Sequence, residues 1–273
     1  MPEGPEMFRM AAKVSDQVAG QPLTEVWFAF PRLQVRVAEL ADQRIARVRT
    51  LGKALLIEFE HGHTIYTHNQ LYGRWLFSPA DRRPDTARQL RLALSTQTRS
   101  ALLYSASEID LIAPDEVQEH PFLRRAGLDV LSSGADVTAV SDWIAQPRYA
   151  RRRLGHLLLD QSFLAGVGNY LRSEILYLAR LHPDTRPGEL NHEQRRALAA
   201  AVHGLMWRSV ETGGITNEAA RVAELRKAGW RRRDYRHFVF GRAGQACFEC
   251  GQAVQKTQVS GRRLYMCPGH QSQ

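Results

Sequence analysis

The sequence predicts a multidomain α+β protein, with an N-terminal antiparallel β-sandwich that begins with a helix, a helical C-terminal domain, and a small cysteine-bearing unit at the end. Residues 23–104 consist of short apolar runs separated by Gly, Pro, Asp and Ser, a pattern typical of an antiparallel sandwich or barrel. Beyond residue 150 the apolar residues recur at helical spacing. All three cysteines lie in residues 247–267.

The first element is expected to be a helix that ends at Gly20-Gln21-Pro22. Its apolar residues recur every three or four positions, at Met7, Met10, Ala11, Val14 and Val18. The strand-like runs that follow are residues 26–30, 54–59, 64–67, 75–77, 90–94 and 101–104. Several short strands in succession, each bounded by turn residues, favour the sandwich.

Composition divides the chain into residues 1–128, a linker or hinge at 129–150, a helical domain at 151–236 and a finger at 237–273. The segment 131–136 is linker-like, and Gln146-Pro147 would break a short helix. Helices are expected at 153–160, 170–179 and 190–210, the last capped by Asn191. Residues 212–236 are charged and lack clear periodicity, so they are expected to form a mobile loop.

Positive charge is concentrated in the second half of the chain. Residues 1–150 hold 17 Lys+Arg against 18 Asp+Glu, a net charge of −1, whereas residues 151–273 hold 20 against 10, a net charge of +10. Such asymmetry suggests a nucleic-acid partner, with a solubilising surface as the alternative.

No apolar run approaches the ~20 residues of a membrane helix, and the acidic N-terminal residues are unlike a secretory signal. An odd number of cysteines also argues against a disulfide framework. We therefore expect a cytoplasmic protein without a membrane partner, and a monomer.

Two pairs of metal-ligating residues lie near the C-terminus. Cys247-x2-Cys250 is followed, after sixteen residues, by Cys267-x2-His270, which is the spacing of a zinc ribbon. Four N or S ligands leave no open position, so the spacing predicts one structural Zn²⁺ per chain. The alternative is three free cysteines beside an incidental histidine.

Residues 158–170 are expected to form a helix, a glycine-containing turn and a second helix. Gly166 and Gly168 permit a tight bend, and Asn169 would open the second helix, where free N–H groups favour a phosphate. A packed helical turn without a ligand is the alternative. The basic excess and the finger favour the phosphate site.

Four motifs occur in order: Met1-Pro2-Glu3-Gly4-Pro5-Glu6, the isolated Lys53, the run 160–170 and the finger. Together they resemble the formamidopyrimidine-DNA glycosylase/endonuclease VIII family over nearly the whole chain. The resemblance implies a β-sandwich N-terminal domain, a helix–two-turn–helix C-terminal domain with a zinc finger, and DNA bound in the cleft between them. It also implies a bacterial enzyme of the cytosol or nucleoid.

Within that family, segments 67–73 and 103–107 resemble the endonuclease VIII branch rather than the 8-oxoguanine branch. The family finger carries four cysteines, and here His270 stands at the fourth position. Cysteine-rich sites with one histidine are ordinary for zinc, so we expect the metal to be kept.

The implied activity is that of a bifunctional DNA glycosylase/AP lyase of base excision repair. It would act on double-stranded DNA with a damaged base or an abasic site, excise oxidised pyrimidines and nick the strand by β,δ-elimination. Such chemistry needs an amine that attacks C1′ and forms a cationic imine there. Pro2, freed by removal of Met1, offers a secondary amine with a pKa of about 8. Taken alone, Pro2 could equally open a helix.

The other catalytic roles are those that the family assigns to matching positions. Glu3 is expected to transfer protons, Lys53 to hold the phosphate of the lesion and assist elimination, and Arg262 to grip phosphate and serve δ-elimination. Arg263, beside Arg262, is the alternative arginine. Glu6 would organise the pocket or, alternatively, stabilise the positive end of a helix.

A base inside a duplex must be flipped out before an enzyme can reach it. Gln70, Leu71 and Tyr72 form a polar, aliphatic and aromatic trio in a turn between two strands, which suits a wedge that fills the vacated stack. His68 and Asn169 are further expected DNA contacts. The alternative is that Leu71 and Tyr72 pack inward at a strand end.

Two other functions compete with this interpretation. One is the same chemistry on oxidised purines, such as formamidopyrimidine or 8-oxoguanine. The other is a zinc-ribbon DNA-binding protein without catalysis, against which the intact Pro2, Glu3 and Lys53 argue.

Overall fold

The computed structural model describes residues 2–40 and 42–271. The chain forms two compact units, Met1–Arg125 and Ala126–Gln273. The division after Arg125 lies close to the expected end of the first domain at residue 128. Among the described residues, no helix is long and apolar enough to cross a membrane.

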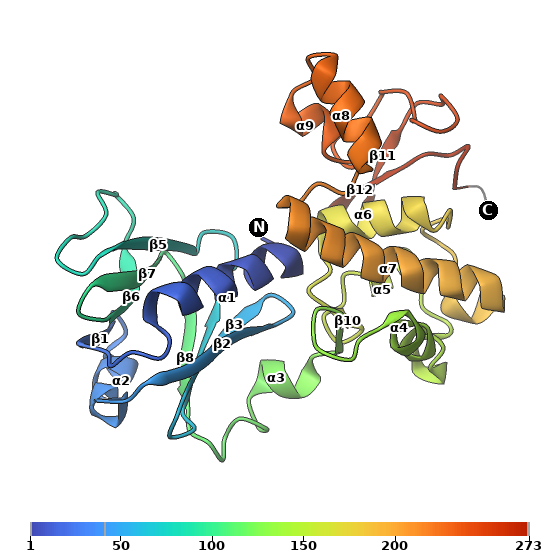
Figure 1. Ribbon diagram of the computed structural model, residues 1–273. Helices are drawn as coiled ribbons and strands as arrows, with labels where there is room; N and C mark the ends of the chain where they lie inside the picture. The colour runs from blue at the N-terminus through green and yellow to red at the C-terminus, as the bar shows by residue number, and fades with distance from the viewer. Residues whose placement is uncertain (1, 41, 272–273) are drawn as a thin grey trace. The chain divides into compact units, whose positions relative to one another are not determined.

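The first unit consists of a helix and two four-stranded sheets, each antiparallel throughout (Figure 1). Helix α1 (Gly4–Val18) comes first. One sheet has the order β1 (Glu25–Phe28), β6 (Leu90–Ser95), β7 (Arg99–Tyr104) and β5 (Arg74–Pro79). The other has the order β2 (Ile45–Leu51), β3 (Ala54–Phe59), β4 (Thr64–His68) and β8 (Glu108–Ile112). The expected sandwich with its leading helix is confirmed.

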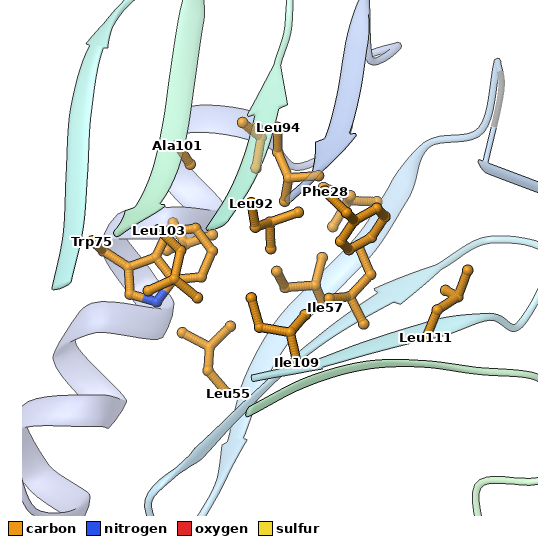
Figure 2. Packing of buried hydrophobic residues seen from close by; sticks show 14 of the residues in the cluster. Phe28, Leu55, Ile57, Trp75, Leu92, Leu94, Ala101, Leu103, Ile109 and Leu111 are labelled. Carbon is orange, nitrogen blue, oxygen red and sulfur yellow. The ribbon is translucent and has the colours of Figure 1, made fainter. Parts of the chain in front are cut away.

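Alternation along the strands explains why two sheets form one core. In β3, Leu55 and Ile57 point into the main core, where they meet residues of the other sheet such as Leu92 and Leu103 (Figure 2). Leu56 lies on the opposite face, in a smaller apolar cluster. The strand is therefore apolar on both faces, and it appears in the sequence as a continuous run.

Short helical segments pack against the sheets of the first unit. They are α2 (Pro31–Gln34), the 3-10 turn η1 (Val37–Leu40) and α3 (Pro121–Arg125). Phe122 and Leu123 of α3 pack against the smaller cluster on the outer face of β3. Helix α3 therefore covers part of this outer face.

The second unit is mainly helical. Its helices are α4 (Val137–Ile144), α5 (Leu154–Leu157), α6 (Asn169–Leu178), α7 (His192–Thr212), α8 (Ala219–Lys227) and α9 (Arg232–Tyr235), with 3-10 turns η2 (Pro147–Tyr149) and η3 (Pro187–Glu189). A parallel pair, β9 (Leu128–Asp129) and β10 (Leu164–Ala165), and the hairpin β11 (Gln255–Val259) and β12 (Arg262–Met266) complete it. Helix α7 packs against α4 and α6, and β12 packs against α6 (Figure 1).

The expected cap of the long helix is confirmed. The side chain of Asn191 accepts a hydrogen bond from the N–H of Gln194 at 2.8 Å. At the other end Gly213 adopts φ +72°, the left-handed conformation that commonly ends helices.

Two segments differ from the sequence expectation. Residues 129–150, expected as a linker, contain α4, which begins at the N-cap Asp136 and packs against α7. Residues 212–236, expected as a mobile loop, contain α8 and α9. The short helix expected to end at Gln146-Pro147 is α4, whereas the local composition of residues 212–236 does not indicate α8 and α9.

Candidate functional site

The N-terminal residues are held by the start of α1. Glu3 is the N-cap residue and is buried, and its N–H donates to Glu6 Oε2 at 2.9 Å. Pro5 occupies the first turn of the helix, whereas Pro2 lies ahead of the cap and is half-buried. The proline that opens the helix is therefore Pro5, which removes the simplest structural explanation for Pro2.

Glu6 acts within this cap. As the third helical residue it accepts from the cap backbone, in the pattern of a capping box. Glu6 therefore does place an acid at the positive end of α1, as the alternative interpretation expected. That contact also fixes the backbone of Glu3, next to Pro2.

Lys53 lies in the two-residue turn between β2 and β3, where Leu51 pairs with Ala54. Gly52 takes the positive φ of +58° that this tight turn needs. The side chain of Lys53 is only 9% exposed, unlike an ordinary surface lysine. Helix α1 packs against β2 and β3, the two strands that this turn connects.

His68 ends β4 opposite Ala54, the residue after Lys53. Burial lowers the pKa of His68, the charge of Lys53 lowers it further, and Glu108 opposes the shift. The neutral ring has an acceptor at Nδ1, and the N–H of Gln70 donates to it at 3.2 Å. His68 therefore links the lysine turn to the loop that follows β4.

Both ends of the Gln70 side chain are already hydrogen-bonded. Its Nε2 donates to Glu108 Oε2 at 2.9 Å, and its Oε1 accepts from the Ser107 hydroxyl at 2.7 Å. Glu108 also accepts from the Tyr66 hydroxyl at 3.1 Å. Gln70 adopts φ +47°, a strained conformation for a residue other than glycine. We call Ser107, Glu108 and His68 the Gln70 clamp.

The next two residues are the largest exposed apolar side chains of the loop. Leu71 is 63% exposed and Tyr72 is 71% exposed, so the alternative of inward packing does not hold. The backbone beneath them is tightly closed: Gly73 N–H donates to Asn69 O at 2.7 Å, and a Cβ at Gly73 would lie 2.6 Å from that oxygen. Leu71 and Tyr72 thus project from a well-defined turn.

In the second unit, Asn169 opens α6 after the turn that contains Gly166, whose φ is +93°. Asn169 Oδ1 accepts from Arg172 Nη2 at 2.9 Å. Arg172 is fully buried, and it also donates to the carbonyl oxygens of Gly155, Val259 and Arg263. One buried guanidinium therefore joins the start of α6 to the β11–β12 hairpin.

That hairpin turns through Ser260 and Gly261, which both have positive φ, as a type I′ turn requires. Ser260 Oγ lies 2.7 Å from Nδ1 of His156 on α5. Arg262 follows the turn and is exposed, like Arg263. The turn is therefore tied to the helices, while the arginine side chains face solvent.

The three cysteines form one cluster. The Sγ atoms of Cys247, Cys250 and Cys267 all lie within 4.8 Å of one another, an arrangement that could hold a metal ion. Burial opposes the thiolate of Cys247, but hydrogen bonds from Tyr177 and from backbone N–H groups outweigh burial and lower its pKa to about 7. Thiolate is the form that binds zinc.

His270 is close to this cluster but is not part of it. Its ring stacks on Tyr177 with 4.5 Å between centroids, and the Tyr177 hydroxyl lies 3.2 Å from Cys247 Sγ. The expected gathering of the cysteines is confirmed, whereas His270 as fourth ligand stays a prediction.

Sequence reasoning missed the buried residues that hold these groups in place. Glu174 of α6 is fully buried; burial raises its pKa, while hydrogen bonds from Thr216 and three backbone N–H groups oppose the rise. Arg172 and the partly exposed Glu108 were also missed, because their partners lie far away in the chain. A charged residue within an otherwise apolar helical run, as at Arg172 and Glu174, was the available signal.

The structure therefore gathers the predicted residues in two groups. Pro2, Glu3 and Glu6 at α1, with Lys53 and the loop after β4, belong to the first unit. Asn169, Arg262 and the cysteine cluster belong to the second unit.

Comparison with known proteins gives the family. Residues 1–106 match the formamidopyrimidine-DNA glycosylase N-terminal domain, and residues 127–220 match the formamidopyrimidine-DNA glycosylase H2TH domain. The chain belongs to this family. It is 43% identical over 272 residues to Endonuclease 8 of Pectobacterium atrosepticum, with all of both chains covered. It is 42% identical to Endonuclease 8 of Shigella sonnei, covering 99% of this chain and 100% of the relative.

Solved structures of the formamidopyrimidine-DNA glycosylase family share the fold. Fpg of Lactococcus lactis, in complex with DNA that contains N7-benzyl-Fapy-dG, superposes with a TM-score of 0.79 at 20% identity, with both chains fully covered. The same protein in complex with DNA that contains an abasic site gives a TM-score of 0.78 at 19% identity. The expected family, and the fold that the resemblance implied, are confirmed.

Proposed function

We propose that this bifunctional DNA glycosylase/AP lyase of base excision repair uses the amine of Pro2 as its nucleophile. The observation that carries the proposal is the position of Pro2, outside the helix that Pro5 opens and next to the buried, capped Glu3. Buried carboxylates are uncommon unless they are paired or functional. A secondary amine beside a carboxyl group can attack and transfer protons at one place.

The reaction follows from these groups. The Pro2 nitrogen attacks C1′ and loses its proton, the glycosidic bond breaks, and the base leaves with the bonding electrons and takes up a proton. Glu3 donates a proton to the ring oxygen as the sugar opens, which leaves an iminium ion on Pro2. Loss of a proton from C2′ then expels the 3′-phosphate, a second elimination expels the 5′-phosphate, and water releases the sugar fragment.

The remaining residues bind and orient the DNA. Lys53, restrained in its turn beside His68, would hold a phosphate next to the lesion. Asn169 at the start of α6 would bind a phosphate, and Arg262 after the hairpin turn would grip another and serve the second elimination. Leu71 and Tyr72 would enter the gap that the flipped nucleotide leaves.

Oxidised pyrimidines in duplex DNA are the proposed substrates. The support is the segment 67–73, which resembles the endonuclease VIII branch, and the relatives named Endonuclease 8. Oxidised purines are the second candidate, because Fpg of Lactococcus lactis shares the fold. We further expect a monomer that works in the bacterial cytoplasm.

A borohydride trapping experiment over a lesion panel tests both chemistry and substrate. We expect a covalent enzyme–DNA adduct through residue 2, with oxidised pyrimidines trapped in preference to oxidised purines. Mass spectrometry of the adduct locates the residue. An adduct on Lys53, together with a fully active Pro2→Gly variant, would overturn the assignment, whereas partial activity of that variant is expected because glycine keeps a free amine.

The cysteine cluster is proposed as a structural zinc site with Cys247, Cys250, Cys267 and His270 as ligands. Zinc supplies folding energy to a small hairpin that cannot bury a core of its own. We expect about one zinc per chain. Metal analysis should show that Cys267→Ser and His270→Ala lose most of the metal, while His192→Ala, an exposed histidine of α7, keeps it. Unchanged zinc content and DNA affinity in His270→Ala would mean that another group is the fourth ligand.

A further inference from the structure

An exposed basic segment in the second unit has no role in the function proposed above. Residues 226–233, which we call the arginine arm, read RKAGWRRR and are exposed at every position. The arm carries five cations and no acid. It contains Trp230, the only tryptophan among the large, strongly exposed apolar residues of the described chain.

The arm is an ordered structure. Helix α8 ends in a Schellman motif, in which Trp230 N–H donates to Leu225 O at 2.9 Å and Gly229 N–H donates to Arg226 O at 3.0 Å. Gly229 takes the required left-handed conformation, with φ +80°. The backbone of Trp230 is therefore fixed, although its side chain remains 39% exposed.

The turn from Cys247 to Cys250, which we call the cysteine knuckle, supports the arm from one side. The ring centroid of Phe248, which lies between Cys247 and Cys250, is 6.3 Å from that of Trp230. The guanidinium groups of Arg221 and Arg242 lie 5.1 and 3.5 Å from the Phe248 centroid. Arg221 also donates to Glu249 Oε1 at 2.8 Å. These contacts dock α8 against the knuckle.

The end of α7 supports the arm from the other side. Arg232 donates to Gly213 O at 2.6 Å, and Arg236 donates to Gly214 O at 3.1 Å, where the carbonyl groups at a helix C-terminus favour cations. Arg231 and Arg233 point into solvent, with side chains 71% and 68% exposed. They share the single carboxylate of Asp234 at 3.4 and 3.6 Å, which cannot neutralise both.

The arm is continuous with the proposed phosphate site at α6. The guanidinium of Arg236, one helical turn beyond Arg232, lies 5.9 Å from the ring centroid of Tyr170, the residue after Asn169. The packed contact between Arg236 and the buried Tyr170 therefore connects the arm to the start of α6.

We propose that the arginine arm is a second nucleic-acid-binding surface, which takes single-stranded DNA; this inference rests on the proposed function. Arg231 and Arg233 bind phosphates, for which guanidinium is well shaped. Trp230, held by the Schellman motif and Phe248, offers its free face to a base. Stacking on an aromatic side chain requires an unpaired base, so the occupant is single-stranded rather than paired DNA.

The test measures binding of the full chain to a lesion-free oligo-dT and to a lesion-free duplex by fluorescence anisotropy. We expect Trp230→Ala and the double variant Arg231→Gln/Arg233→Gln each to lose about tenfold in affinity for oligo-dT and much less for the duplex. The slope of log affinity against log salt should fall by about 1.4 in the double variant, and not in Trp230→Ala, because ~0.7 per phosphate contact is lost on single strands.

Three controls accompany this experiment. Arg196→Gln removes an exposed charge from α7 and should bind like the wild type. Trp230→Phe keeps an aromatic face and should retain most of the affinity. Tryptophan emission should be quenched by oligo-dT in the wild type and not in Trp230→Phe, a change that a merely structural role of Trp230 would not produce.

The outcomes are separable from those of the proposed function. Unchanged oligo-dT binding in the arm variants, or equal losses on oligo-dT and duplex, would overturn the proposal for the arm. The proposed function would stand if the wild type still excised lesions. A wild type that binds oligo-dT through the arm but excises no lesion would instead overturn the glycosylase.

Discussion

Blocking the N-terminal amine should abolish both base excision and borohydride trapping. If residues that precede Pro2 are left uncleaved, its nitrogen becomes part of an amide, which has no basic lone pair for attack on C1′. We expect the single-turnover excision rate to fall on the order of 10⁴-fold or more, as for other covalent nucleophiles. Because Pro2 lies outside α1, the extension should leave the cap at Glu3 intact.

The matched control is the same extended chain after a protease has exposed Pro2 as the first residue. The two samples then differ only in the peptide bond at Pro2, and the cleaved sample should regain full activity. Persistent trapping by the extended chain would place the nucleophile elsewhere, with Lys53 as the first residue to examine. Equal thermal unfolding of the two samples would show that the fold is unchanged.

Shortening the exposed pair Leu71 and Tyr72 to alanine should slow excision from duplex DNA by about 30- to 150-fold. Opening the stack costs a few kcal/mol, and the two side chains offset part of that cost by filling the gap. About 2–3 kcal/mol of lost stacking and packing corresponds to this change in rate. The measurement is the single-turnover rate on a duplex that carries one oxidised pyrimidine.

The same lesion in single-stranded DNA is the internal control, because little stacking must be broken there. We expect only a small loss on the single strand, and an intermediate loss on a duplex abasic site. Equal losses on paired and single-stranded substrates would mean that Leu71 and Tyr72 support the fold or the catalytic groups, and the wedge would have to be abandoned.

Elements whose apolar pattern is strong could be predicted from the sequence. Helix α1 buries Met7, Ala11, Val14 and Val18, four of the five residues that define its period. The apolar runs of β3 and β7 became central strands of their sheets. Strand β8 was missed because Glu108 and Asp110 interrupt its apolar residues, and their side chains lie on the outer face of the sheet.

The unpredicted helices depend on distant partners. Helix α8 buries little of itself, with Val222 as its only buried residue, and its contacts to Phe248 and Glu249 come from a segment more than twenty residues away. For α4, the sequence indicated a short helix that ends at Gln146-Pro147, but the Ser and Gly residues before Asp136 favoured a linker and gave no sign of its packing against α7. No local pattern reports such packing.

The candidate site divides in the same way. Pro2, Glu3 and the three cysteines are recognisable because neighbouring residues in the sequence identify them. Pro2 follows a removable methionine, Glu3 follows Pro2, and the cysteines have the fixed spacing of metal ligands. The residues that position them are not local. Glu108 meets Gln70 across thirty-eight positions, and Arg172 reaches Arg263 across ninety-one.

The Gln70 clamp bears on how a base edge could be discriminated. Since Ser107 and Glu108 already satisfy both ends of the Gln70 amide, a Gln70 that enters DNA exchanges hydrogen bonds rather than adding new ones. A matching base edge replaces the hydrogen bonds that Gln70 loses on leaving the clamp, so the affinity for DNA rises little. A mismatched edge leaves a desolvated donor or acceptor without a partner, which costs about 1–3 kcal/mol. Gln70 would then act as a filter that penalises the wrong neighbour.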